Sequence, residues 1–161
     1  MTRSRRLGLV ALVVVAALAT VVGISVSGDS KPGRSDDRSA GSLLLIARQF
    51  NEDYSANRDG AVYDRWDSAS QRVISRARYI EFHRVCMTAP GPAVVEGATR
   101  AGGGFWTVRY SIDGNQLLDY WHYEDGRWLF SLVKSNPGAV ELYKLPLRDY
   151  MVAAGCSEPA G

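Results

Sequence analysis

Residues 105–130 read FWTVRYSIDGNQLLDYWHYEDGRWLF, and this stretch decides the fold. It is rich in aromatic and β-branched residues, which is typical of strands. Asp113-Gly114 and Asp125-Gly126 interrupt it, and Asp-Gly pairs tolerate the positive φ angles that tight hairpins require. We therefore expect hairpin-linked strands over 105–112, 116–123 and 127–133. An earlier strand over 93–100, ending before Gly102-Gly103-Gly104, completes a predicted four-stranded antiparallel meander.

The residues before this predicted sheet show the spacing of helices. Apolar residues recur at intervals of three and four from Leu43 to Tyr54, with Ser42 as the expected N-cap. A second, short helical segment is expected over 61–66, after Asp59-Gly60. The spacing therefore predicts a first helix of about four turns and a short second one.

A further helix is expected next, capped by Ser68 or Ser70 and restarted at Ser75. On its continuation, one helical face carries two aromatic residues, a histidine and a cysteine. These residues are Tyr79, Phe82, His83 and Cys86. We expect this face to point into the core.

The end of the chain is predicted to return to this helix. Asn136-Pro137-Gly138 is expected to break the fourth strand, and helical spacing over 147–154 follows Pro146, at an expected first-turn position. Cys86 and Cys156 form an even pair, which in an exported chain favours a disulfide. Helices, a meander and a disulfide-tethered C-terminal helix define an α+β fold class.

The N-terminus predicts export. Arg3, Arg5 and Arg6 precede an uncharged, mostly apolar stretch over 7–26. Its length lies between that of a cleaved signal and that of a spanning helix, so residues 1–27 are either a signal peptide or an N-terminal membrane anchor. In both cases the basic residues keep the N-terminus in the cytoplasm, and the rest of the chain becomes extracytoplasmic, either anchored (N-in, C-out) or secreted.

Residues 28–41 are polar and contain Pro, Gly and Ser, which predicts a flexible linker before a single domain over 42–161. Three of the 19 Lys and Arg lie in the leader, so the remainder nearly balances the 17 Asp and Glu. This balance excludes the basic footprint of a nucleic-acid-binding protein.

Three strings resemble the nuclear transport factor 2-like superfamily: NEDYSANRDGAVYDRWDS (51–68), ISRARYIEFHRVC (74–86) and YEDGRWLF (123–130). The chain also resembles the non-catalytic N-terminal domain of certain penicillin-binding proteins, which has this fold. The resemblance implies helices packed on a curved sheet, with a cone-shaped cavity between them. The C-terminal helix and the disulfide depart from the superfamily pattern, and that helix is a candidate lid over the cavity.

Candidate pocket residues follow from this expected cavity. Alternation places Trp106, Val108, Tyr110 and Ile112 on one strand face, the expected inner one. Both faces of the next strand carry aromatic residues, so alternation leaves the orientation of Asp119, Tyr120 and His122 open. With Tyr79 and His83 from the helix, the candidate set is Tyr79, His83, Tyr110, Asp119, Tyr120 and His122.

Two interpretations of these residues stand side by side. An isomerase-type site would pair Asp119 or Asp67, as base, with Tyr110 or Tyr120, as phenol donor. In the structural interpretation, Asp67 caps a helix, Asp119 is solvated and the tyrosines fill the core. A metal site would need His83 and His122 to converge with a carboxylate, and we expect neither a metal nor a cofactor.

The sequence therefore favours an extracytoplasmic, non-catalytic accessory or interaction domain that binds a protein partner or a small apolar ligand. A homodimer is compatible with the abundant aromatic residues. The alternative is a small-molecule isomerase or dehydratase that uses a carboxylate in the cone cavity.

Overall fold

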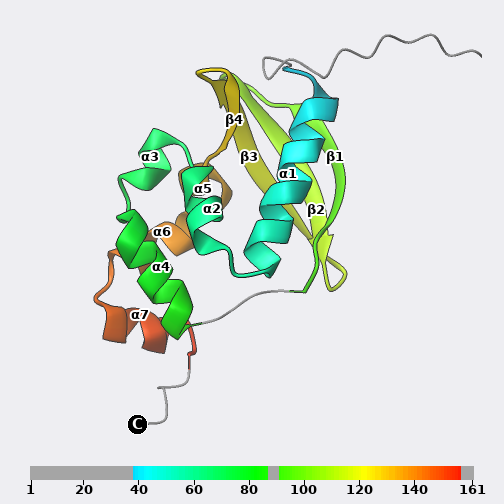
Figure 1. The fold of residues 1–161 in the computed structure, drawn as a ribbon. Helices are drawn as coiled ribbons and strands as arrows, with labels where there is room; N and C mark the ends of the chain where they lie inside the picture. The colour runs from blue at the N-terminus through cyan, green and yellow to red at the C-terminus, as the bar shows by residue number, and fades with distance from the viewer. Residues whose placement is uncertain (1–37, 87–90, 157–161) are drawn as a thin grey trace, which may run out of the picture. The chain divides into compact units, whose positions relative to one another are not determined.

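The computed structural model of this chain describes residues 38–86 and 91–156 (Figure 1). The predicted leader and nearly all of the predicted linker lie outside the described residues. Before the sheet the structure has α1 (Ala40–Ser55), α2 (Asp59–Asp64), α3 (Ser68–Gln71) and α4 (Arg76–Val85). The strands are β1 (Val94–Arg100), β2 (Phe105–Ile112), β3 (Asn115–Glu124) and β4 (Arg127–Phe130). After the sheet come α5 (Leu132–Ser135), α6 (Pro137–Lys144) and α7 (Leu147–Ala153). Within the described part, no helix has the length and apolar character needed to cross a membrane.

The sheet is the predicted antiparallel meander, with strand order β1-β2-β3-β4. Asp113 and Asp125 have φ angles of 49° and 50°, and each is followed by a glycine that also has positive φ. Both hairpins therefore use the Asp-Gly geometry expected from the sequence.

The fourth strand ends earlier than predicted, at Phe130 instead of residue 133. The Leu132 amide donates a hydrogen bond to Ser70 Oγ at 2.8 Å, and α5 begins at that residue. The open edge of β4 is occupied by the segment around Trp66, which pairs with Phe130 in parallel. These contacts turn the chain out of the sheet.

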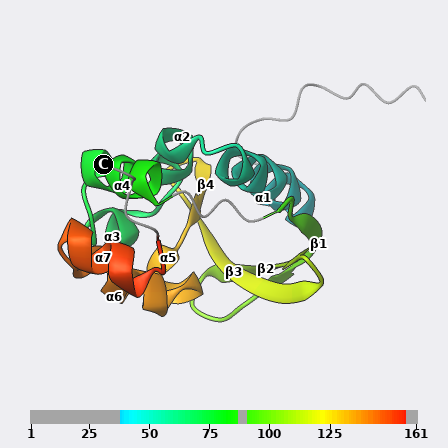
Figure 2. The ribbon, with the colours of Figure 1, turned by 90° about the horizontal axis from the view of Figure 1, so that it is seen from below.

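Helix α1 lies along the sheet (Figures 1 and 2) and buries Leu43, Ala47 and Phe50. The Phe50 ring contacts Trp121 of β3 at a centroid distance of 5.2 Å. We call the sheet face that bears Val108, Asp119 and Trp121 the inner face. The predicted N-cap was wrong by one turn, because Ser39 caps α1 and Ser42 Oγ instead accepts a bond from Trp128 Nε1 at 2.9 Å.

Side-chain oxygens cap helices α3 and α4. Asp67 caps α3, with its Oδ1 accepting from the Ser70 amide at 2.7 Å, so the expectation of a serine cap there was wrong. Ser75 caps α4, which confirms the predicted restart. The inward face of α4 is also confirmed, since Tyr79, Phe82 and His83 are all buried.

Helix α6 was not predicted, because Asn136-Pro137-Gly138 indicates only the end of the fourth strand. Asn136 Oδ1 accepts from the Ala139 amide at 2.9 Å, and Pro137 occupies the first turn, where a missing N–H costs nothing. The residues predicted to end the fourth strand therefore cap helix α6. This helix brings Tyr143 into the core.

Helices α6 and α7 lie beside α4, away from β1 (Figures 1 and 2). The predicted disulfide is present: Cys86 at the end of α4 is bonded to Cys156 after α7. The Phe82 and Tyr150 rings pack at a centroid distance of 4.4 Å. The structure therefore confirms an α+β fold whose last helix is tied by a disulfide to an earlier one.

Candidate functional site

A pocket of about 590 Å³ lies between the helices and the inner face of the sheet. Its walls are mainly apolar, with aromatic and aliphatic side chains, and its polar groups are acids, amides and hydroxyls. The aromatic residues are Phe50, Tyr54, Trp66, Tyr79, Tyr110, Phe130 and Tyr143. The polar ones are Asn51, Asp113, Asn115, Asp119, Ser135 and Asn136. The structure thus has an open pocket between the helices and the sheet.

Asp119 is the most deeply buried acid in this wall. It sits opposite Val108 in the β2–β3 register and is only 6% exposed, so its interpretation as a solvated residue was wrong. The Tyr110 hydroxyl donates to its Oδ1 at 3.2 Å. Burial outweighs this bond and raises the pKa of Asp119 to about 7.

Tyr110 reaches Asp119 along a diagonal of the sheet. Its own register partner is Leu117, two residues before Asp119, and the two side chains share the inner face. Burial, and then the neighbouring carboxylate, raise the pKa of the Tyr110 phenol. Near neutral pH Tyr110 is therefore a hydrogen-bond donor, while Asp119 can either accept or give up a proton.

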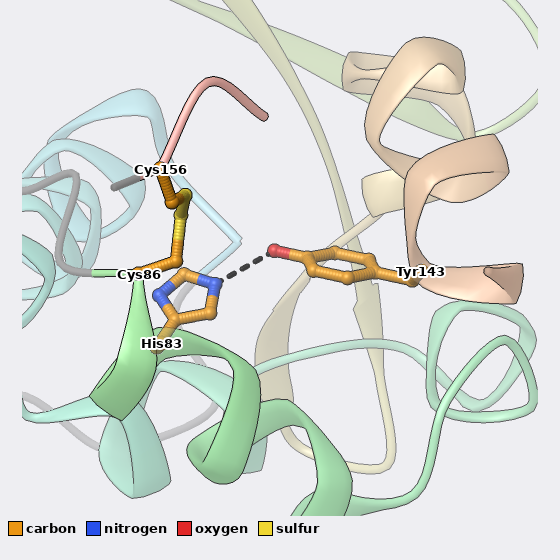
Figure 3. Close-up of a disulfide and its surroundings, with 4 residues drawn as sticks. All are labelled: His83, Cys86, Tyr143 and Cys156. Carbon is orange, nitrogen blue, oxygen red and sulfur yellow. Dashed lines mark hydrogen bonds between the residues drawn. A yellow bond between two sulfur atoms is a disulfide. The ribbon is translucent and has the colours of Figure 1, made fainter. Parts of the chain in front are cut away.

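A second polar group lies behind the pocket wall and includes Tyr143. Figure 3 shows His83 of α4 pointing at Tyr143 of α6, with Nε2 and the hydroxyl 2.8 Å apart. On the other side of the ring, His83 Nδ1 lies 3.2 Å from Asp59 Oδ1. Burial lowers the pKa of His83 to about 4, so the ring is neutral at physiological pH.

Because the His83 ring is neutral, one nitrogen donates and the other accepts, which sets the direction of the hydrogen bonds in the Asp59–His83–Tyr143 relay. Nδ1 lies beside a carboxylate, so we assign the ring proton there, which leaves Nε2 as the acceptor for the Tyr143 hydroxyl. The Tyr79 ring packs on His83 at a centroid distance of 4.2 Å and closes the cluster. Sequence reasoning missed Asp59 and Tyr143. Pro137 at a helix start was the signal that could have revealed Tyr143.

The six candidate residues separate into three groups. Tyr79, Tyr110 and Asp119 line the pocket, and His83 contacts it through Tyr143. Tyr120 and His122 lie on the outer face, where the Phe105 and His122 rings are 5.1 Å apart. Asp67, the alternative base, caps α3 as the structural interpretation held, and its Oδ2 lies 3.4 Å from His122 Nε2.

The two histidines therefore belong to separate clusters on opposite sides of the sheet. Among the described residues no group of three or more His, Cys, Asp and Glu side chains converges on a point where a metal could bind. The chemistry available in the pocket itself is hydrogen bonding, proton exchange at Asp119 and contact with aromatic rings.

Known proteins add no independent assignment of this site. The chain matches no family model, no curated protein and no solved structure. The resemblance to the nuclear transport factor 2-like superfamily stays a prediction, and any function rests on the geometry of the pocket.

Proposed function

We propose that this domain is an extracytoplasmic, non-catalytic binding module that takes a small, mainly apolar ligand into the pocket. The observation that carries the proposal is an open cavity of about 590 Å³ whose walls are mainly aromatic and aliphatic and whose most buried acid is Asp119. Ligand sites of about 300–1,000 Å³ with apolar walls and a few polar groups are typical of proteins.

The extracytoplasmic placement rests on two features. The Cys86–Cys156 disulfide is favoured in oxidising compartments, and the basic, apolar leader is typical of exported chains. The alternative occupant, a protein partner, has weaker support. Exposed large apolar residues such as Leu45, Val94 and Val152 lie on different elements and do not make a continuous surface that the structure defines.

Binding is tested with 1-naphthylmethanol, a neutral probe that fits the pocket, by isothermal titration calorimetry. We expect saturable binding, with amide shifts in NMR spectra concentrated on β2, β3 and α6. Ala139→Phe places a ring in the pocket wall and should abolish binding, whereas Ala153→Phe on the exposed side of α7 should not. Equal binding by both variants, or none by the wild type, would refute the proposal.

One observation favours a second candidate, an isomerase or dehydratase. A carboxyl with a pKa near 7, beside a phenol donor, has the properties of a general base with an oxyanion donor. Conversion of a β,γ-unsaturated ketone to its conjugated isomer, followed by ultraviolet absorbance, tests it. Turnover that Asp119→Asn removes would support the enzyme, and the absence of turnover with a ketone shown to bind would exclude this reaction.

A further inference from the structure

Asp119 is a buried acid for which the pocket provides no positive charge. Asp119 is 6% exposed, and the hydrogen bond that the described residues give its carboxyl comes from the Tyr110 hydroxyl to Oδ1, which leaves Oδ2 for a ligand. No Lys, Arg or His is among the described residues that line the pocket, whereas a second acid, Asp113, is. Buried carboxylates are normally paired with a cation, so this site lacks a counter-charge.

Two further residues of the wall present oxygen atoms that can accept hydrogen bonds. The Asn51 amide spends one N–H on the Ala47 carbonyl at 2.9 Å, and its Oδ1 has no partner among the described residues. Tyr143 donates its only proton toward His83, so its oxygen is left as an acceptor on the pocket side. A ligand that satisfies these atoms must bring N–H or O–H donors.

The aromatic wall suits the apolar body of a ligand. Trp66, Tyr79 and Tyr143 form one cluster, with centroid distances of 4.7 Å between Trp66 and Tyr79 and 5.7 Å between Tyr79 and Tyr143. Aromatic side chains pack favourably against the apolar body of an organic ligand. The same surface is unfavourable for an anion, which would meet two carboxyl groups and no cationic side chain.

We propose that the pocket selects an organic amine in its protonated form, with the ammonium group at Asp119 Oδ2 and the apolar body against the aromatic cluster. This inference rests on the proposed function and names the ligand class of the same pocket. The ammonium supplies the missing counter-charge, and its N–H groups can donate to the carboxylate. No proton or bond needs to be transferred for binding.

The test compares 1-naphthylmethylamine with 1-naphthylmethanol, which have the same body and differ chiefly in charge. Calorimetry is done at about pH 8, where Asp119 is ionised and the amine is protonated. We expect the amine to bind the wild-type protein about tenfold more tightly than the alcohol, because only the amine forms an ion pair with the Asp119 carboxylate.

Asp119→Asn should reduce this preference to about unity, while Asp149→Asn, the same change on the exposed side of α7, should leave it intact. Equal binding of the two probes to the wild type would overturn the amine inference and leave the binding function standing. Failure of both probes to bind would instead refute the binding function. An amine preference that persists in Asp119→Asn would show that Asp119 is not the recognition group.

Discussion

Asp119 makes stability depend on pH through one carboxyl. Its pKa rises from 3.8 to about 7 on folding, so the folded state holds this proton more tightly than the unfolded state does. The free energy of unfolding therefore falls as pH rises between about 4 and about 7, and the penalty is constant above that range.

Asp119→Asn should accordingly stabilise the protein in the alkaline range and not in acid. We expect a gain in the free energy of unfolding of up to about 4 kcal/mol at about pH 8, which shrinks toward zero near pH 4. Urea unfolding of wild type and variant at both pH values measures it. A difference that does not change with pH would show that Asp119 does not titrate as its burial requires.

His83 is expected to stay neutral where an ordinary histidine gains its charge. Burial lowers its pKa to about 4, although Asp59 lies 3.2 Å from Nδ1. For a base whose folded pKa is depressed, stability is lost as pH falls from about 6.5 to about 4. In His122→Gln, which leaves His83 as the only histidine, the ring C–H signal in NMR should not shift between about pH 8 and about pH 5.5.

Titration of that signal near pH 6.5 would mean that the Asp59 carboxylate outweighs burial. The relay would then carry a positive ring that donates to Tyr143. The phenol would lose its acceptor and turn its own proton toward the pocket. The donor and acceptor pattern of the site thus depends on this one ring.

At the scale of elements, the sheet offers a matched pair of glycines, one in the β2–β3 turn and one in β1. Gly114 has a φ of +79° in the turn, whereas Gly97 in β1 has no positive φ, and in both cases an added Cβ meets nothing within 4 Å. Gly114→Ala should destabilise by about 1 kcal/mol, and Gly97→Ala should be neutral or slightly stabilising. Thermal unfolding of the two variants compares them, and equal effects would refute the conformational explanation.

The disulfide ties α7 to α4 across 70 positions. In the loop-entropy model a bridge of this span stabilises by about 4 kcal/mol, with a lower value in practice. Reduction should therefore lower the urea midpoint of the wild type. The double variant Cys86→Ala, Cys156→Ala serves as the control and should not respond to reductant. If its midpoint also falls, the reductant acts elsewhere than on the bridge.

Strands and helices were predictable to different degrees for physical reasons. Alternation and Asp-Gly pairs are local signals, so β2 and both hairpins were placed correctly. The end of β4 depends on a bond from Leu132 to Ser70, 62 positions away, which no local pattern contains. The start of α6 used residues that end one element and begin another equally well.

The residues of the site also divide into those that local sequence patterns predict and those that depend on long-range packing. Strand alternation made Tyr110 an inner-face residue, and helical spacing turned Tyr79 and His83 inward. The orientation of Asp119 could not be read from a strand with aromatic residues on both faces. It follows from the contact of its neighbour Trp121 with Phe50 of α1, which belongs to the tertiary packing.

At the scale of the whole domain, a single core joins the layer of helices to the sheet. The buried cluster runs from Leu43 of α1 through Trp66 and Trp121 to Tyr150 of α7. Trp66 lies beside the helices, whereas Trp121 is fully buried in the sheet. Within the described residues no buried core residue precedes Leu43, and α1 has its own cap at Ser39.

We therefore expect a fragment of residues 38–161 to fold without the leader and to unfold in one transition. Helix content by circular dichroism reports mainly on α1, α4 and α6, and tryptophan fluorescence reports on both layers, so the two urea curves should coincide. Curves that separate would mean that α4 and α7, which the disulfide joins, open together with α6 while the sheet stays folded. The pocket wall formed by Tyr79 and Tyr143 would then be lost before the wall formed by Asp119 and Tyr110, and ligand would bind only to the closed form.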